Sequence, residues 1–317
     1  MVYPSPISGR HEMSPREIAS NSTLGVSLRS DVPRAEQDLI VLIPNASLQI
    51  MLRCTCRSLR TTVQFEKIIA VSPKPSWRTR GLLMAAALTG LTIEIPEQPY
   101  NSDDLIYAFE SIDTSDRKQG IHPGHGSARA WLAHLDIMKY VIASHMSSAF
   151  IVEDDVDWDI NIHSQMRLVS DHTREFLQAP LTDSSPFGHG WDVLWLGHCG
   201  DELAEESLAY ADSTILDVEI STGWSKKYVL IEQLPHGHRA VQYVQDVGCT
   251  FGHGVTRLGA RRILQFLGAG QDEAFDVALM NQCRKGNLQC ITVLPELMHH
   301  YTPKERTGYI SPNDETE

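Results

Sequence analysis

The stretch AFIVEDDVDWD, residues 149–159, places several carboxylates directly after a short apolar run. Glu153, Asp154 and Asp155 are consecutive, so their charges repel one another and each charge is costly to remove from water. A metal ion, an arginine or water could compensate them. Carboxylate oxygens at such a place suit Mn²⁺ or Mg²⁺, and these ions in turn bind phosphate oxygens. The alternative interpretation is a solvated acidic loop after a strand.

The geometry of a strand predicts how the three side chains divide. Alternate side chains of a strand point to opposite faces. Glu153 and Asp155 are therefore expected to point together and to share a metal ion. Asp154 is expected to point away and to hydrogen-bond with backbone or with a sugar hydroxyl.

The segments around this run predict an α/β fold. FEKIIAVS (65–72) and LTIEI (91–95) are typical of strands, and RGLLMAAALTG (80–90) is typical of a helix closed by Gly90. A strand, a helix and a second strand in this order indicate a parallel sheet. In open α/β sheets ligands bind beyond the carboxyl ends of the strands, which is where the acidic run would lie.

The later segments continue the pattern. Helices are expected at 126–145, 163–178, 257–268 and 275–286, and strands at 148–154, 191–197 and 289–295. Trp131, Leu135, Met138 and Ile142 recur at helical spacing and should form the apolar face of the first of these helices. Loops are expected at 97–123, and loops with short strands at 200–245.

Composition excludes some classes of function. The net charge of −13 over 317 residues argues against a nucleic-acid partner. No apolar run reaches the ~18 residues of a membrane span, and the first residues lack the apolar core of a signal peptide. As written, the chain would stay in the cytosol. The six cysteines, of which Cys54 and Cys56 lie close together near the N-terminus, have no convincing zinc spacing. The four in the C-terminal half, Cys199, Cys249, Cys283 and Cys290, fit either two disulfides or reduced thiols.

Several stretches in collinear order resemble glycosyltransferase family 25. These are ARAWLAHLDIMKYVIASHMSS, AFIVEDDVDWD, WDVLWLGHCG, GCTFGHGVTRLGARRIL, FDVAL and LPELMHH. The family includes lipopolysaccharide-type and collagen-type sugar transferases, and the chain looks most like its fungal members. The resemblance spans residues 65–303.

This resemblance implies a GT-A-like α/β fold with a mostly parallel central sheet. It also implies a nucleotide-sugar donor, usually a UDP-sugar, a hydroxyl acceptor on a glycan or protein, and Mn²⁺ (or Mg²⁺) on the donor diphosphate. A place in the secretory pathway, in the Golgi or ER lumen, would follow. It favours framework disulfides among the four C-terminal cysteines.

The resemblance also implies roles for single residues. Glu153 and Asp155 would hold the metal, with His299 or His300 as a late ligand, although a surface histidine pair is the alternative. Asp154 would lie beside the metal. Asp276 is the expected acceptor-side base, because the acceptor hydroxyl must lose a proton, and an N-cap aspartate is the alternative.

Donor contacts are expected on both sides of this run. His134 would meet donor or acceptor unless it is a core or capping histidine, while Gly252, His253 and Gly254 would form a close backbone approach. The stretch SPKPSWRTRG (72–81) departs from the family pattern, because Pro75 and Trp77 stand where an arginine and an aspartate are expected. Its remaining donor-binding residues are Trp77, which could stack on uracil or simply pack, Arg78 and Arg80.

Two rival functions remain open. The altered 72–81 turn would suit a degenerate family member that binds glycans or partners without turnover. A metal-dependent phosphohydrolase would use the same carboxylates but needs further Asp or His ligands at other strand ends, and the sequence shows no convincing set.

The ends of the chain are expected to be irregular, over residues 1–64 and 304–317. Val26–Gln64 matches nothing, and Val26-Ser27 and Gln64 can be encoded by GTAAGT and CAG, the typical ends of an intron. Our hypothesis is that this stretch is a translated, unspliced insert; full-depth transcript coverage across it would contradict the idea. Membrane association would then require an upstream anchor missing from this chain.

Overall fold

The computed structural model describes residues 63–110, 123–215, 232–271 and 273–300. Contacts divide the chain into Met1–Arg53 and Cys54–Glu317, and every described residue lies in the second unit. The expected tail and nearly all of the expected irregular N-terminal segment therefore fall outside the described residues. Of the expected insert only Val63 and Gln64 are described. Val63 is buried in the core, and Gln64 Nε2 donates to the carbonyl of Met166 at 3.3 Å.

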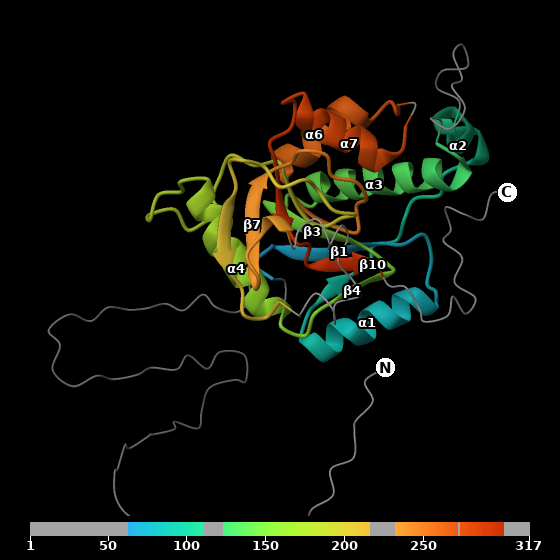
Figure 1. Ribbon diagram of the computed structural model, residues 1–317. Helices are drawn as coiled ribbons and strands as arrows, with labels where there is room; N and C mark the ends of the chain where they lie inside the picture. The colour runs from blue at the N-terminus through green and yellow to red at the C-terminus, as the bar shows by residue number, and fades with distance from the viewer. Residues whose placement is uncertain (1–62, 111–122, 216–231, 272, 301–317) are drawn as a thin grey trace, which may run out of the picture. The chain divides into compact units, whose positions relative to one another are not determined.

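The described elements are strands and helices intermixed along the chain, which confirms the α/β class (Figure 1). The first half contains β1 (Lys67–Val71), α1 (Trp77–Thr89), β2 (Ile93–Glu94), α2 (Asp103–Glu110), α3 (His125–Ala143), β3 (Ser148–Glu153), β4 (Val156–Trp158) and α4 (Ile162–Phe176). The second half contains β5 (Val193–Gly197), β6 (Leu208–Ala211), β7 (His238–Tyr243), β8 (Gly252–Thr256), α6 (Arg257–Leu267), α7 (Phe275–Arg284), β9 (Cys290–Leu294) and β10 (Met298–His300).

The central sheet has the strand order β2-β1-β3-β8-β5-β9-β7-β6. The pairs β1/β2, β1/β3 and β5/β9 are parallel, and the four other pairs of this series are antiparallel. Six of these eight strands consequently run the same way, against β8 and β7. The sheet is more mixed than expected, because the glycine-rich segment β8 runs antiparallel between β3 and β5. From the sequence this segment was expected to be a close backbone approach and not a strand. Since β8 separates two strands of equal direction, β3 and β5 end at the same edge.

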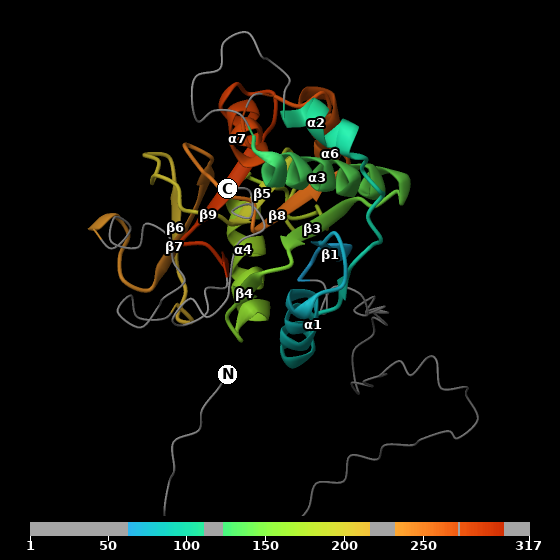
Figure 2. The same cartoon turned by 90° about the vertical axis from the view of Figure 1, so that its right-hand side faces the viewer.

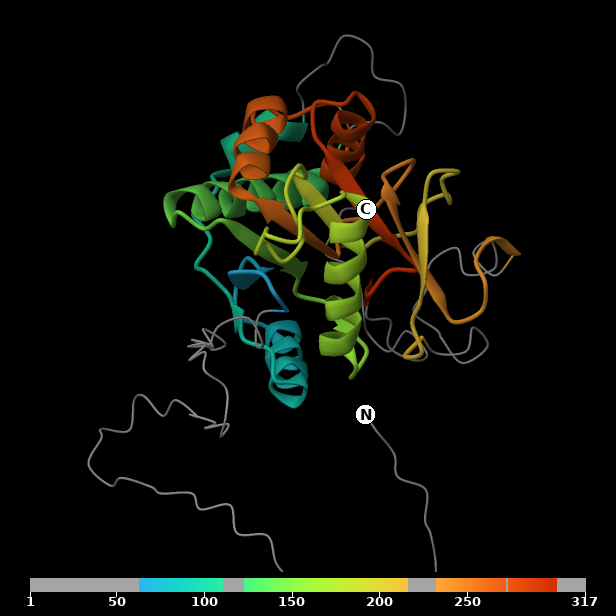
Figure 3. The same ribbon diagram turned by 90° about the vertical axis from the view of Figure 1, so that its left-hand side faces the viewer.

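Side-chain alternation along the central strands builds two apolar layers. Ile69, Ile151 and Trp195 pack under α3, α6 and α7, whereas Phe150 and Leu194 belong to the opposite core with α1 and α4. Figure 2 shows α3, α6 and α7 above the sheet and α1 below it. Figure 3 shows α1 and α4 together on the lower side. The result is a sheet covered by helices on both faces.

Most expected elements are confirmed, with differences at their ends. The expected loop 97–123 contains α2, and the expected strands within 200–245 include β6 and β7. Helix α1 ends as expected at Gly90, which has φ +69°. It begins three residues earlier than expected, at Trp77, and this difference matters for the site. None of the described helices combines the length and the apolar composition of a membrane span.

Both disulfides that the C-terminal cysteines allow in this unit are formed. Cys199 is bonded to Cys249, and Cys283 to Cys290. The first joins the loop after β5 to the loop before β8. The second joins the end of α7 to the start of β9. Of the two interpretations left open by the sequence, the structure therefore contains disulfides at these four positions.

Candidate functional site

The acidic run lies at the carboxyl end of β3, but its side chains do not alternate as expected. The strand ends at Glu153, and a turn carries the next two residues. Asp154 and Asp155 therefore reach the same partner, Arg78, while Glu153 turns to a different loop. The expectation that Glu153 and Asp155 point together and Asp154 points away is wrong, because the regular strand stops one residue too early.

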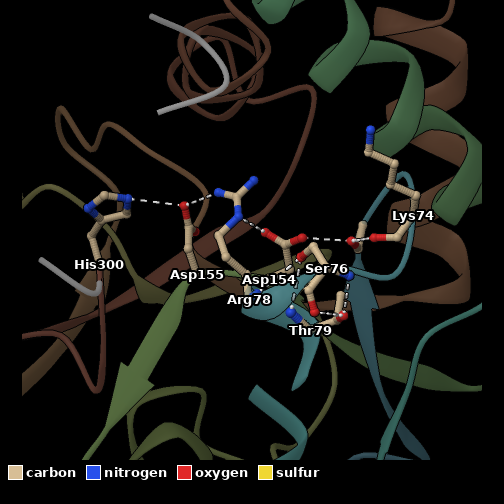
Figure 4. A network of polar contacts seen from close by, with 8 residues as sticks. Lys74, Ser76, Arg78, Thr79, Asp154, Asp155 and His300 are labelled. Carbon is tan, nitrogen blue, oxygen red and sulfur yellow. Dashed lines mark hydrogen bonds and ion pairs between the residues drawn. The ribbon is translucent and has the colours of Figure 1, made fainter. Parts of the chain in front are cut away.

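Arg78 is the positive partner of the two aspartates. Its Nε lies 3.3 Å from Asp154 Oδ1, and its Nη1 lies 2.9 Å from Asp155 Oδ2. The three side chains are only 8–15% exposed, so the pairing takes place largely out of water. In Figure 4 the guanidinium lies between the two carboxylates. In this structure an arginine, one of the three expected kinds of partner, compensates the acidic run.

Asp154 is the most deeply buried carboxylate of the run. Ser72, directly after β1, donates its hydroxyl to Asp154 Oδ2 at 2.6 Å. Burial raises the pKa of Asp154, and the hydrogen bond from Ser72 and the charge of Arg78 offset part of that rise. The charges of Asp155 and Glu153 raise the pKa further. Burial therefore disfavours the charged form of Asp154, and Ser72 and Arg78 are the two partners that stabilise that form.

The N-terminus of α1 places Arg78. Ser76 is the N-cap, in an extended conformation, and its side chain accepts hydrogen bonds from the backbone N–H groups of Arg78 and Thr79. Thr79 Oγ1 accepts in return from the N–H of Ser76 at 2.9 Å, which completes a capping box. The residues of this capping box, Ser76 and Thr79, are visible in the sequence, but the expected helix began only at Arg80. Because the helix starts here, Arg78 lies in its first turn and faces the carboxyl end of β3.

We expect Ser76→Ala to lower the free energy of unfolding by about 1 kcal/mol, because two backbone N–H groups lose their acceptor. Ser76→Gly should cost only about 0.3 kcal/mol, since glycine leaves those groups open to water. Urea denaturation of both variants checks this. Equal losses for the two variants would contradict the capping role.

His300 joins the site from β10, which pairs with β4. Its Nε2 lies 3.2 Å from Asp155 Oδ2, and its ring stacks on Phe251 with the centroids 5.3 Å apart. The hydrogen bond with Asp155 raises the pKa of His300, and the charges of Asp155 and Glu153 act in the same direction. His299 is adjacent in the same strand, so the two histidines face opposite sides. Of this expected pair, the structure brings His300 to the acidic run.

Glu153 contacts the loop before β8. Thr250 donates its hydroxyl to Glu153 Oε1 at 2.9 Å, and the backbone N–H of Glu153 donates to the carbonyl of Phe251 at 3.0 Å. His134 Nε2 lies 3.7 Å from the same carboxylate oxygen. Thr250 and Phe251 were not expected at the site. No local pattern marks them, because they reach Glu153 only through the position of β8 beside β3.

The two expected donor-binding histidines are buried. His134 stacks on Phe275 with the ring centroids 4.6 Å apart. His253, in the centre of the sheet, is fully buried, and burial together with the charge of His134 lowers its pKa to about 3. His253 has no exposed surface with which it could meet a donor, and its ring lies beside those of His134 and Trp195.

The glycines of β8 serve close packing of the core. A Cβ on Gly254 would lie 2.5 Å from two ring atoms of Phe65, and one on Gly252 would lie 3.0 Å from Met298 Cγ. The expected close approach is present, but its partners are core side chains.

Asp276, Trp77 and Arg80 occupy other positions around the site. Asp276 lies in the first turn of α7, whose N-cap is Ala274, so it is not an N-cap aspartate. Its Oδ2 accepts a hydrogen bond from the backbone N–H of Cys249 at 2.8 Å.

The two other expected donor-binding residues lie on α1, the helix that also carries Arg78. Trp77 is 54% exposed, and Arg80 is exposed as well.

The expected metal ligands are only partly assembled. Across the described ranges, no three side chains of His, Cys, Asp or Glu form a group that could hold a metal ion. Asp155 and His300 converge as a pair. Mg²⁺ sites use one or two carboxylates when substrate phosphates supply the rest. Through the carboxylate of Asp155 the pair therefore fits an ion that arrives with a phosphate ligand. It does not form an all-protein cage.

Comparison with known proteins leaves the family open: no protein-family model matches the chain, and neither does any curated protein.

Proposed function

We propose that the chain is a glycosyltransferase that moves a sugar from a nucleotide-sugar, in the first instance a UDP-sugar, to a hydroxyl of a glycan or protein. The observation that carries the proposal is the network Asp154–Arg78–Asp155–His300 at the carboxyl end of β3. It lies where ligands bind in α/β sheets. It also combines cations for a diphosphate with carboxylates for a metal ion and for sugar hydroxyls.

The roles follow from the contacts. Asp155 and His300 would hold Mn²⁺, with Glu153 adding negative charge close by. When bound, the ion would neutralise charge on the departing nucleotide. Arg78 pairs with both aspartates and holds them in place until the donor arrives. The exposed Arg80 and Trp77 extend the same helix turn toward a nucleotide.

Asp154 would hydrogen-bond a sugar hydroxyl as an acceptor, as its Oδ2 already does with the hydroxyl of Ser72. The two disulfides agree with a place in an oxidising compartment such as the Golgi or ER lumen.

A second candidate is a family-like protein that binds glycans without turnover. It is favoured by the pairing of Arg78 with both aspartates, because this pairing occupies the oxygen that would face a metal ion. The departures at Pro75 and Trp77 point the same way.

The test is release of UDP by the full chain with Mn²⁺, a panel of UDP-sugars and candidate acceptors. Release that needs both metal and acceptor would support transfer. Release by metal alone would indicate hydrolysis. No release from any donor by the folded protein would contradict the transferase and leave glycan binding.

Asp155→Asn should lower the metal-dependent rate at least about tenfold, since it removes the charge shared by the metal, Arg78 and His300. Asp171→Asn is the matched control, because Asp171 is an exposed aspartate of α4. Equal rates for the two variants would show that Asp155 does not contribute to the reaction.

A further inference from the structure

A short strap, residues 248–251, touches the candidate site. It immediately precedes β8. As described above, Thr250 donates to Glu153 Oε1, and the carbonyl of Phe251 accepts the N–H of Glu153. The ring of Phe251 stacks on His300. One end of the strap therefore fixes a carboxylate and a histidine of the proposed site.

The other end of the strap is anchored at Cys249. Its N–H donates to Asp276 Oδ2 at 2.8 Å, and its carbonyl accepts from Trp195 Nε1 at 2.8 Å. Its sulfur is bonded to Cys199, whose own N–H donates to the carbonyl of Gly248 at 2.8 Å. All the hydrogen-bonding backbone atoms of Cys249 thus have a partner.

Cys249 needs these anchors because of its backbone conformation. Its φ is +63°, in the left-handed region that costs free energy for a residue with a Cβ. Such a conformation persists only where the surroundings enforce it, and it is found most often near functional sites. Here the enforcing groups come from β5, from the loop after it and from α7.

Asp276 is one of these groups, and its geometry differs from that of a free base. The carboxylate does not cap its own helix, whose N-cap is Ala274. It reaches across to another segment and accepts a backbone N–H there. An oxygen held in this way is committed to a structural hydrogen bond in the resting protein.

We infer that Asp276 is a positioning residue: with the Cys199–Cys249 disulfide it holds Cys249, so that Thr250 and Phe251 reach Glu153 and His300. This replaces the role of acceptor-side base expected from the sequence. The activity measurement rests on the proposed function, whereas the exchange measurement below does not.

The experiment compares Asp276→Asn with Asp276→Ala in the full chain. Asparagine offers Cys249 a carbonyl acceptor of the same shape, and alanine offers none. We expect the alanine variant to exchange the backbone amides of the strap about tenfold faster in hydrogen–deuterium exchange. Sugar-transfer kcat should fall about tenfold, because displaced site residues lose alignment. The asparagine variant should stay within about twofold of the parent in both measurements, with an unchanged pH profile.

The matched control is Glu66→Ala. Glu66 also accepts a backbone N–H, that of Ser147 at 2.7 Å, but lies just before β1, at the end of the sheet opposite the acidic run. It should leave exchange in the strap unchanged.

Two results overturn the inference. If asparagine loses as much activity as alanine while its strap stays protected, Asp276 acts as a base. If the alanine variant exchanges its strap no faster than the parent, Asp276 does not hold Cys249. The second result is decisive even when no donor is turned over, so failure of the proposed function and failure of this inference are distinguishable.

The disulfide is tested in the same way. Replacing Cys199 and Cys249 together by serine should also speed exchange in the strap, whereas replacing Cys283 and Cys290 should not. Mild reduction of the folded parent, followed by the same measurement, serves if the first variant does not fold. If exchange in the strap is unchanged in both cases, the Cys199–Cys249 disulfide does not help to hold Cys249.

Discussion

Replacing Arg78 with methionine is expected to lower the free energy of unfolding by about 4 kcal/mol near neutral pH. Methionine keeps much of the side-chain volume but removes the cation that contacts both Asp154 and Asp155. The two carboxylates are 8–9% exposed, so water does not replace the lost partner. Truncating one member of a buried ionic group leaves its partners uncompensated, which costs more than the pairing itself contributes.

The loss should depend on pH with a definite sign. Burial raises the pKa of Asp154 in the folded protein, so above the ordinary value of about 3.9 the folded state holds a proton that the unfolded chain has released. Stability from this group therefore falls as the pH rises through that window. Arg78 opposes the rise in pKa, and its removal must extend the window upward. The deficit of the variant should be smallest in acid and should grow toward neutrality.

Urea denaturation at about pH 4 and about pH 8 measures this difference. Arg80→Met is the matched control, because it removes the same charge from an exposed position of the same helix. It should change stability by less than about 0.5 kcal/mol. Equal losses at both positions, or a deficit for Arg78→Met that shrinks as the pH rises, would contradict the compensating role of Arg78.

The strands and helices could be predicted from sequence where a local period was strong. The segments FEKIIAVS and SAFIVED and the helix around Trp131 have an apolar pattern that tertiary contacts merely reinforce. β8 was missed because its sequence, GHGVT, is poor in strand-forming residues. Its glycines are required by Phe65 and Met298, which lie far away in the chain. That requirement is non-local, so no window of sequence contains it.

The candidate site, too, has features that could be predicted from the sequence and others that could not. The acidic run and its place at the end of β3 could be predicted, since the apolar strand and the charges are contiguous. The choice of Arg78 as the partner could not, because it depends on where α1 begins and on β1 lying beside β3. The direction of each carboxylate depends on the strand ending at Glu153.

A second large loss of stability is expected from a substitution at a glycine that is not part of the candidate site. Gly259, in α6, packs on the start of β5: a Cβ there would lie 2.2 Å from the carbonyl oxygen of Asp192 and 2.8 Å from its carbonyl carbon. Asp192 cannot move aside easily. Its side chain is paired with Arg262 at 2.6 Å, and its N–H donates to the carbonyl of Gln289 at 2.7 Å. An added methyl group therefore meets backbone that is fixed from two further directions.

We expect Gly259→Ala to lower the free energy of unfolding by about 2 kcal/mol. Two terms oppose each other: overpacking against fixed backbone costs about 3 kcal/mol, and alanine gains about 1 kcal/mol in helix propensity over glycine. Gly81→Ala in α1 isolates the second term, because no atom lies within 4 Å of a Cβ at that exposed position. It should stabilise the protein by up to about 1 kcal/mol. Thermal or urea unfolding of the two variants should therefore give changes of opposite sign, and a gain in stability at both positions would mean that α6 can move away from Asp192.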